Sequence, residues 1–282
     1  MSEFTGIRGR AWFKALTGQE SSIQGDPPSV LTTDALIGDD KGRFLCVVPD
    51  PGGRFPCARR GEVGLEEAYT LAARVREVTN ADKDGKKRPI IAIVDLKSQA
   101  YGRREEIAGI HLAAAAAADA YATARFAGHP IVALIVGQAI SGGFLTHGYQ
   151  ANRLLAFDDD GVLIHAMHKE AAARVTRRTV AQLDKLAETV PPLSYDVRDY
   201  AKLGLLYKLL QVANPQNPGA SDISLVRGEL IAAIQDARKG SRDLRTRLDS
   251  EGARSARKAS RLARARLEEQ WKEQAFTTAS SY

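Results

Sequence analysis

The sequence predicts an α/β fold in which helices cover both faces of the strands. Short, almost continuously apolar runs alternate with segments whose apolar residues recur at helical spacing. Runs that are apolar throughout are typical of strands buried on both sides of a sheet. The expected strands are 43–49, 89–95, 130–136, 153–157 and 162–166.

The composition is that of a globular protein. The chain has 282 residues, of which 44% are hydrophobic and 26% charged, enough for one substantial core and an appendage. No apolar run approaches the roughly 18 residues that a membrane-spanning helix needs. Glu3, Arg8 and Arg10 leave no apolar stretch for a secretory signal near the amino terminus. We therefore expect a cytoplasmic protein that contacts no membrane.

Helices are expected between the strands. Apolar residues recur at helical spacing over 65–78, and the polar segment 80–85 ends this helix before the next strand. The longest candidate, 105–127, begins with acidic residues and ends at a Gly-His-Pro sequence, as capping and dipole preferences favour. Its unbroken alanines at 113–118 indicate close packing. We expect a structural role for this helix.

The last third of the chain predicts a change of organisation. An apolar stripe at 172–186 and a shorter one at 197–207 predict two helices, and the Asn- and Pro-rich segment 214–219 predicts a linker. The expected parts are a domain at 1–212, a linker at 213–222 and a charged, helical extension at 223–282.

The extension carries the basic charge. From 238 to 273 we count 12 Lys or Arg and 6 Asp or Glu, a surplus of +6 that equals the formal net charge of the chain. The arginines are interleaved with acidic residues, and only Trp271 and Phe276 offer rings for stacking on bases. Nucleic-acid binding is therefore not favoured. An acidic partner, such as a carrier protein, fits the same charge.

The most informative segment is Gly137-Gln-Ala-Ile-Ser-Gly-Gly-Phe144, which directly follows an expected strand. A strand that passes Ser141 and enters Gly142 and Gly143 before a helix presents unhindered backbone N–H groups where negative charge is favoured. Such donors stabilise enolates and tetrahedral anions, although a plain strand-to-helix turn gives the same pattern. Because Ala139 replaces the first glycine of G-x-S-x-G, Ser141 is expected to cap the helix.

A second strand-to-helix turn is expected in Asp95-Leu-Lys-Ser-Gln-Ala-Tyr-Gly-Arg-Arg-Glu-Glu106. The turns at Gly102 and Gly142 would then lie side by side at the carboxyl ends of neighbouring strands. This pairing is more specific than either turn alone.

No metal site is expected. Cys46 and Cys57 lack a second pair to complete a zinc site, and the five histidines show no metal-ligand spacing. Both thiols are expected to be structural. His147 lies four residues past Gly143 and is expected to be a core histidine.

Several separated motifs then point to one family. They are Arg8-Gly-Arg-Ala-Trp-Phe-Lys-Ala-Leu16, Val48-Pro-Asp-Pro51, Arg59-Arg-Gly-Glu-Val-Gly-Leu65, Ser98-Gln-Ala-Tyr-Gly-Arg-Arg-Glu-Glu106, Ser141-Gly-Gly-Phe-Leu-Thr-His147, Ala173-Arg-Val-Thr176 and Tyr200-Ala-Lys-Leu-Gly204. The sequence resembles the acyl-coenzyme A carboxyltransferase branch of the crotonase superfamily and, within it, the gamma-subunit family of biotin-independent malonate decarboxylases. The resemblance covers roughly residues 5–212, and the charged extension lies outside it.

The resemblance implies a crotonase-like ββα spiral, the ClpP/crotonase fold, working as a heterodimer with a homologous beta subunit. The implied reaction converts a malonyl thioester on an acyl carrier protein to the acetyl thioester and carbon dioxide through an enolate. The chain would bind no cofactor, because the substrate is carried on the phosphopantetheine-type, coenzyme A-derived group of the carrier protein. The carrier protein and the alpha subunit, an acyl carrier protein transferase, are further implied partners.

The resemblance also implies two oxyanion holes. The N–H groups of Gly142 and Gly143 would form one, and the backbone from Ala100 through Tyr101 to Gly102 would form the other. Which hole holds the enolate and which the carboxylate stays open.

Three neighbouring side chains complete the expected site. Gln99 and Tyr101 are candidates for binding the carboxylate or donating a proton, with loop packing as the alternative role for each. Ser141 is expected beside the substrate. Arg60 is expected either to contact the substrate or to line the subunit interface.

Three rival functions stay open at this point. The first is a subunit of a biotin-dependent acyl-coenzyme A carboxyltransferase. The second is a stand-alone hydratase or thioesterase, for which Glu105 or Glu106 would be the base. The third is a scaffold without catalytic function that only holds the beta subunit.

Overall fold

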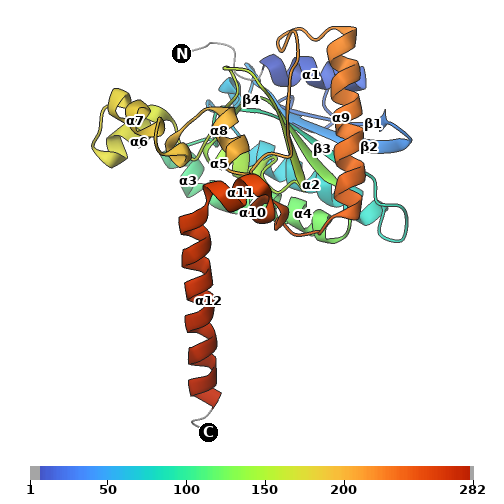
Figure 1. The fold of residues 1–282 in the computed structure, drawn as a ribbon. Coiled ribbons are helices and arrows are strands. Elements are labelled where there is room, and N and C mark those ends of the chain that lie inside the picture. Colours follow the sequence, from blue (N-terminus) through green and yellow to red (C-terminus); the bar gives the residue numbers. More distant parts are fainter. Residues whose placement is uncertain (1–6, 280–282) are drawn as a thin grey trace.

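A seven-stranded mixed sheet forms the centre of the protein (Figure 1). The computed structural model describes residues 7–279. The strand order is β1-β2-β3-β4-β5-β7, and β6 pairs with the carboxyl-terminal part of β4. β1 and β2 form an antiparallel hairpin, and the other pairings are parallel. The strands are β1 Val30–Ile37, β2 Asp40–Val47, β3 Ile90–Leu96, β4 Ile131–Ile140, β5 Arg153–Phe157, β6 Leu163–His165 and β7 Lys208–Leu210.

Helices cover both faces of the sheet. The long helices α2 and α4 pack side by side over one face, whereas α1 and α9 pack together over the other (Figure 1). Among the described residues, no helix is both long enough and apolar enough to cross a membrane. The helices are α1 Ile7–Thr17, α2 Leu65–Ala81, α3 Arg103–Ile107, α4 Ile110–Phe126, α5 Ser141–Thr146, α6 Lys169–Thr176, α7 Val180–Ala187, α8 Val197–Lys202, α9 Ala220–Lys239, α10 Thr246–Asp249, α11 Glu251–Ala256 and α12 Lys258–Ala279, with short 3₁₀ turns at Ala58–Arg60 and Pro191–Leu193.

The α/β class and the five expected strands are confirmed, but two strands were not predicted. β1 carries Thr and Asp within its apolar pattern and lies at the edge of the sheet, so it has no continuous apolar run. Its Asp34 pairs across the hairpin with the buried Arg43 of β2. β7 is a strand of three residues that directly follows the helix predicted over 197–207, and that helix, α8, already ends at Lys202.

Two predicted helices are each divided in the structure. The expected helix 105–127 is interrupted at Gly109, which has a φ of 85° and separates α3 from α4. The expected helix 172–186 is interrupted at Arg177, which has a φ of 53°, and Thr179 then caps α7 through the N–H of Gln182. Residues in the left-handed conformation commonly interrupt helices in this way.

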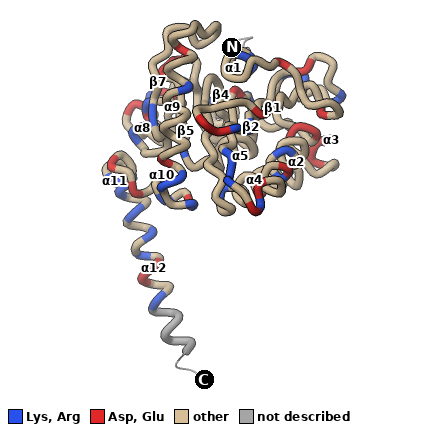
Figure 2. Tube along the Cα trace, turned by 90° about the vertical axis from the view of Figure 1, so that its right-hand side faces the viewer, with Lys and Arg blue, Asp and Glu red and all other residues tan. Residues whose placement is uncertain are grey.

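The core extends beyond residue 212 into the segment that the sequence assigned to the extension. Val226, Leu230 and Ile234 of α9 belong to the same buried cluster as the sheet. The segment before α9 is also fixed, because Asp222 accepts hydrogen bonds from the N–H groups of Ala213 and Asn214. These N–H groups hold the pKa of Asp222 below its usual value. By contrast, α12 projects from the body and carries mostly exposed, charged side chains in its first half (Figure 2).

A buried histidine joins α4, α5 and β3. His147 is fully buried, as the sequence predicted. Its Nε2 lies 3.0 Å from the carbonyl oxygen of Ile93, and its Nδ1 lies 2.9 Å from the hydroxyl of Tyr121. A neutral ring with the proton on Nε2 satisfies both contacts, since Tyr121 then donates to Nδ1. Burial lowers the pKa of His147 to about 4.

Because His147 is buried in its neutral form, we expect the protein to lose stability in acid. The unfolded chain binds a proton at His147 near pH 6.5 and the folded chain only near pH 4, so folding opposes protonation in that window. We expect the free energy of unfolding to fall by up to about 3 kcal/mol as pH drops from about 6.5 to 4, and this part of the slope to vanish in His147→Gln. Urea titrations of both proteins at a series of pH values measure it. Identical slopes would contradict a neutral, buried His147.

Candidate functional site

Two strand-to-helix turns meet at the carboxyl ends of β3 and β4. The loop after β3 spans 97–102, and the turn after β4 enters α5 at Ser141. The hydroxyls of Tyr101 and Ser141 lie 3.1 Å apart and are joined by a hydrogen bond. A Cβ at Gly142 would lie 2.8 Å from Oε1 of Gln99. Residues that are 40 positions apart in the sequence thus share one site.

Ser141 has an unusual backbone conformation. Its φ is 60°, in the left-handed region that residues other than glycine rarely adopt. It is the first residue of α5 and its side chain makes no capping hydrogen bond, so the predicted capping role is wrong. The turn at Ser141 instead directs its hydroxyl at Tyr101. Strained positions of this kind cluster at functional sites.

Gly143 lies where two backbones touch. A Cβ built there would lie 2.6 Å from the carbonyl carbon and oxygen of Ser98, and 3.0 Å from the amide nitrogen of Gln99. Beside the unhindered amide that the sequence predicted, this glycine thus has a structural reason. The absent side chain lets α5 begin directly against the loop after β3.

The first turn of α5 supplies free amides. The first N–H groups of a helix, up to the third residue after its N-cap, have no intrahelical acceptor, and in α5, whose N-cap is Ile140, these include the N–H groups of Gly142 and Gly143. The N–H groups of Gly142 and Gly143 thus retain the donor capacity that an oxyanion hole requires.

The loop after β3 is held by a segment far from it in sequence. The N–H of Val63 donates to the carbonyl of Ser98 at 3.0 Å, and the N–H of Ala100 donates to the carbonyl of Val63 at 2.8 Å. The Ala100 amide is therefore engaged within the chain, contrary to the expectation that it faces the substrate. In the described part of the chain, the N–H groups of Tyr101 and Gly102 have no such acceptor.

Gln99 and Glu105 complete the loop. Oε1 of Gln99 is buried and, within residues 7–279, has no hydrogen-bond partner. Glu105 is buried beside Gly102, where a Cβ would lie 2.4 Å from its Oε2, while Glu106 is exposed. Glu105 thus packs under its own loop. An unpartnered buried amide oxygen is costly unless a ligand completes its contacts.

Arg60 reaches the same loop through Cys57. Nη2 of Arg60 lies 3.5 Å from Sγ of Cys57 and 3.3 Å from Oε1 of Glu62. The Cys57 thiol in turn donates to the carbonyl of Tyr101 at 3.5 Å. Burial and the nearby Glu62 raise the pKa of Cys57 to about 11, so the thiol stays protonated at neutral pH. Sequence reasoning gave Cys57 and Val63 no role at the site, because their contacts are to backbone groups of a distant loop. Glu62 was missed as well, and it acts on that loop only through Arg60 and Cys57.

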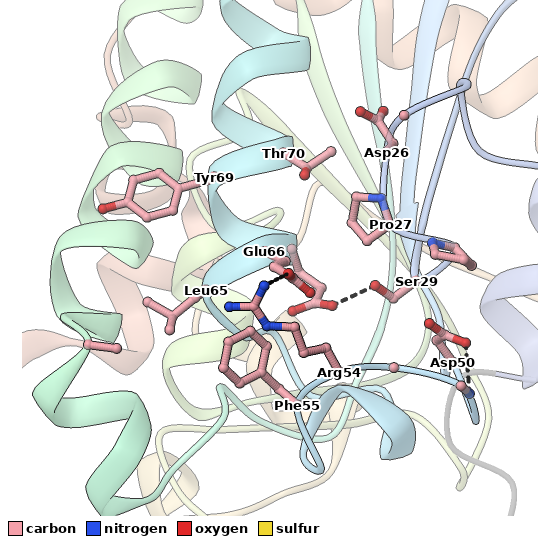
Figure 3. A pocket seen from close by; sticks show the side chains of 16 residues that line it. Asp26, Pro27, Ser29, Asp50, Arg54, Phe55, Leu65, Glu66, Tyr69 and Thr70 are labelled. Carbon is pink, nitrogen blue, oxygen red and sulfur yellow. Dashed lines mark hydrogen bonds and ion pairs between the residues drawn. The ribbon is translucent and has the colours of Figure 1, made fainter.

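A pocket of about 800 Å³ lies beside the amino-terminal end of α2 (Figure 3). Its wall includes the carboxylates of Asp26, Asp50 and Glu66, together with Arg54, which faces Glu66 at 3.7 Å. None of the predicted site residues lines it. The predominance of carboxylates disfavours phosphate groups in this pocket.

Within the described residues, no group of three or more His, Cys, Asp or Glu side chains is arranged to hold a metal ion. Cys46 and Cys57 are both buried and unbridged.

The sheet and its paired turns define a crotonase-like carboxyltransferase fold. The structure is similar to Transcarboxylase 12S, with a TM-score of 0.62 at 15% identity over 82% of this chain and 42% of that chain, which shows the fold alone. Residues 58–271 match the family model described as malonate decarboxylase gamma subunit. The chain therefore belongs to the malonate decarboxylase gamma subunit family.

Individual relatives agree with this membership. A chain of a Pseudomonas malonate decarboxylase hetero-tetramer in complex with coenzyme A is 51% identical, with a TM-score of 0.87 over 92% of this chain and 99% of that chain. A Pseudomonas malonate decarboxylase hetero-dimer gives 51% identity and a TM-score of 0.86, covering 94% of this chain and 99% of that one. The malonyl-S-ACP:biotin-protein carboxyltransferase MADD of Malonomonas rubra is 35% identical over 81% of this chain and 80% of its own length.

The family match corrects one expectation. The resemblance was expected to end near residue 212, but the matched region continues to residue 271. The helices from α9 into α12 are therefore part of what the family shares.

Substitutions at the two glycines of α5 should differ in their effect on stability. Gly143→Ala places a Cβ against the Ser98 backbone, which has no flexible end to move, so we expect a loss of about 2 kcal/mol in unfolding free energy. Gly142→Ala meets only the end of the Gln99 side chain and should leave stability nearly unchanged. Urea unfolding of the two variants checks both values.

The matched control is Gly228→Ala. Gly228 lies within α9, and a Cβ there has nothing within 4 Å. This variant should gain up to about 1 kcal/mol from helix propensity. Equal stabilities for the Gly143 and Gly228 variants would contradict the close backbone contact.

Proposed function

We propose that this chain works with a homologous beta subunit to remove carbon dioxide from a malonyl thioester carried on an acyl carrier protein. The observation that carries the proposal is the contact between the two turns, which sets the free amides of α5 beside the Tyr101 hydroxyl. Family membership supports it independently.

Decarboxylation breaks the bond between the carboxylate carbon and C2 of the malonyl group. The electron pair moves towards the thioester carbonyl and gives an enolate oxygen, while carbon dioxide leaves. The N–H groups of Gly142 and Gly143 donate to that oxygen. A donor that strengthens as the charge develops is worth about 3 to 4 kcal/mol in the transition state.

The enolate then needs one proton at C2. Tyr101 carries a hydroxyl that is half exposed and held by Ser141, so it is the proposed donor. Gln99 is the proposed ligand of the departing carboxylate through its side-chain amide, because its buried Oε1 lacks a partner. The N–H groups of Tyr101 and Gly102 form the second donor set, without Ala100.

The relatives support the proposed partners. The Pseudomonas malonate decarboxylase proteins form a hetero-dimer and a hetero-tetramer, and the name of the Malonomonas rubra protein contains malonyl-S-ACP. We include in the proposal the beta subunit, the carrier protein, the alpha subunit that acts as an acyl carrier protein transferase, and a cytoplasmic location. The substrate would arrive on the coenzyme A-derived arm of the carrier protein, with no cofactor held by this chain. Arg60 is exposed near the Tyr101 loop and is placed at the edge of this site.

Carboxyl transfer to a biotin protein is the second candidate function. The 35% identity to the carboxyltransferase of Malonomonas rubra favours it. The two reactions share the enolate and differ in the fate of the carboxyl group.

The decisive assay uses the complex of this chain with its beta subunit. We expect carbon dioxide release from malonyl-carrier protein that avidin does not change. A need for a biotinylated protein, and inhibition by avidin, would establish the transfer reaction instead. No release with either acceptor would contradict both.

Tyr101→Phe tests the proton donor. It removes the hydroxyl and keeps the ring, so kcat should fall at least about 100-fold while KM changes little. Ser141→Ala is the matched control, since it removes only the partner of the hydroxyl, and a fall of about 10-fold or less is expected. A kcat of Tyr101→Phe close to that of the unmodified complex would exclude Tyr101 as the donor.

A further inference from the structure

The segment that leads from α11 into α12 is strongly basic. Residues 252–267 contain six Lys or Arg side chains and no Asp or Glu, because the acidic residues of the extension lie on either side of this segment. Blue segments accordingly follow one another from α11 into the first turns of α12 (Figure 2). The charge of this segment is as large as the formal net charge of the whole chain, +6. The basic charge is therefore concentrated where α12 leaves the body.

The backbone stays helical where α11 meets α12. The N–H of Arg257 donates to the carbonyl of Ala253 at 3.0 Å, and the N–H of Arg261 donates to the carbonyl of Arg257 at 3.0 Å. Residues three or four positions apart therefore share a face across the junction. Four arginines follow that spacing and form one stripe, which we call the arginine face. It consists of Arg254, Arg257, Arg261 and Arg264.

Most charges of the arginine face have no counter-charge in the chain. Arg261 lies 3.8 Å from Asp249. Among the side chains described for residues 7–272, no carboxylate forms an ion pair with the other three arginines of the stripe. Glu268, the next acidic residue, is paired with Lys272 at 2.8 Å. Because like charges three or four positions apart destabilise a helix, a negatively charged partner would offset a cost that the chain alone does not.

The arginine face borders a pocket of about 370 Å³ between α10, α12 and the body. Four arginines line the pocket, among them the half-buried Arg257 and the exposed Arg264, together with three leucines and, among the described residues, a single carboxylate. That carboxylate, Asp243, is paired with Arg245 at 3.2 Å and accepts a hydrogen bond from its N–H. The pocket therefore offers unpaired positive charge next to apolar surface, which matches a protein segment with acidic and apolar side chains.

Trp271 lies on the same side of α12, farther from the body. It follows Arg264 by seven residues, as Arg264 follows Arg257, and two helical turns return to nearly the same face. Its side chain is 75% exposed, whereas Trp12 is fully buried in the core. Tryptophan and arginine are the residues that dominate binding energy in protein interfaces. A partner that enters the angle between the body and α12 would contact both (Figure 1).

The chemistry of this surface favours a partner that binds and leaves. Permanent subunit interfaces are more apolar and have few charges at their centre, whereas the arginine face is charged and largely exposed. Complementary charge chiefly raises the rate of association. A carrier protein that delivers a thioester and departs with the product needs that property.

The pocket adjoins the helix that provides the oxyanion donors. Tyr149 belongs to its wall, and the centroid of the Tyr149 ring lies 5.5 Å from that of Phe144 in α5. α5 has six residues and is therefore about 9 Å long, with Gly142 and Gly143 in its first turn. A substrate on the coenzyme A-derived arm can bridge a separation of this order while the protein part of the carrier stays on α12.

We propose that the arginine face of α11 and α12, together with Trp271, binds an acidic face of the carrier protein. The guanidinium groups pair with carboxylates of the carrier, and the tryptophan ring packs on an apolar side chain beside them. This inference rests on the proposed function for the identity of the partner.

Binding of the carrier protein is measured without turnover. The probe is fluorophore-labelled carrier protein that lacks its prosthetic group, titrated with the complex of this chain and its beta subunit, and fluorescence anisotropy gives the Kd. We expect saturable binding that weakens steeply as salt is added, because exposed charges are screened. Carrier protein with its prosthetic group should bind with a similar Kd, since the acidic side chains make the contact.

Two exposed arginines of α12 give a matched pair of variants. Arg264 belongs to the arginine face, whereas Arg266, two residues on, lies about 200° away around the helix. Arg264→Glu should raise the Kd at least about 5-fold. Arg266→Glu makes the same charge change and should alter the Kd by less than about 2-fold. Trp271→Ala should raise the Kd at least about 10-fold and leave its salt dependence unchanged.

Turnover separates this inference from the proposed function. In the Arg264→Glu complex, KM for malonyl-carrier protein should rise at least about 5-fold with kcat unchanged, because Arg264 contacts only the protein part of the substrate. Carbon dioxide release with an unchanged KM would refute binding at the arginine face and leave the reaction standing. Carrier binding that Arg264→Glu weakens, with no carbon dioxide release by the unmodified complex, would refute the reaction and leave the binding surface standing.

Three results would overturn the proposal. One is the absence of carrier binding to the unmodified complex. Another is an equal Kd for the Arg264 and Arg266 variants, which would place the carrier elsewhere. The third is tighter binding of a single-stranded oligonucleotide than of the carrier, lost in Arg264→Glu, which would make the arginine face a nucleic-acid surface.

Discussion

The whole candidate site depends on one contact without side chains, the approach of Gly143 to the backbone of Ser98. Because β3 and β4 are adjacent and parallel, their following segments leave the sheet at the same edge. Only the absence of a Cβ allows α5 to begin against the preceding loop. The left-handed conformation of Ser141 then turns its hydroxyl towards Tyr101. The free amides, the phenol and the Gln99 amide are thereby arranged by backbone packing.

A second close approach supports this edge from within the sheet. A Cβ at Gly137 would lie 2.1 Å from Oδ1 of the buried Asp95, at the irregular register between β3 and β4. Asp95 accepts hydrogen bonds from the N–H groups of Gln138 and Gly9. Asp95 therefore links the carboxyl-terminal part of β4 to the start of α1. β4 is ten residues long, so it pairs with β3 and also with β5 along 132–135 and with β6 along 138–140.

The sequence predicted the features that local pattern controls and missed those that long-range contacts control. Apolar runs predicted five strands, and the glycines of the segment 137–144 predicted a strand-to-helix turn, because both are properties of short segments. The engagement of the Ala100 amide by Val63 could not be predicted, since it depends on a main-chain pairing across 37 positions. The edge strand β1 was missed because its polar residues break the apolar run, and the helix breaks at Gly109 and Arg177 were missed because apolar spacing does not reveal a left-handed residue.

The pairing of Val63 with the 98–100 backbone couples two parts of the surface. Val63 uses both its N–H and its carbonyl in these hydrogen bonds. The connection between β2 and α2 is therefore tied to the loop after β3. The same connection contacts the loop at a second place, because Arg60 binds the Cys57 thiol and that thiol donates to the carbonyl of Tyr101. Both hydrogen bonds of Val63 use main-chain atoms, so they do not depend on its side chain. Val63 is also buried in the core, however, and only an apolar side chain of similar size keeps that packing while the hydrogen bonds hold the loop.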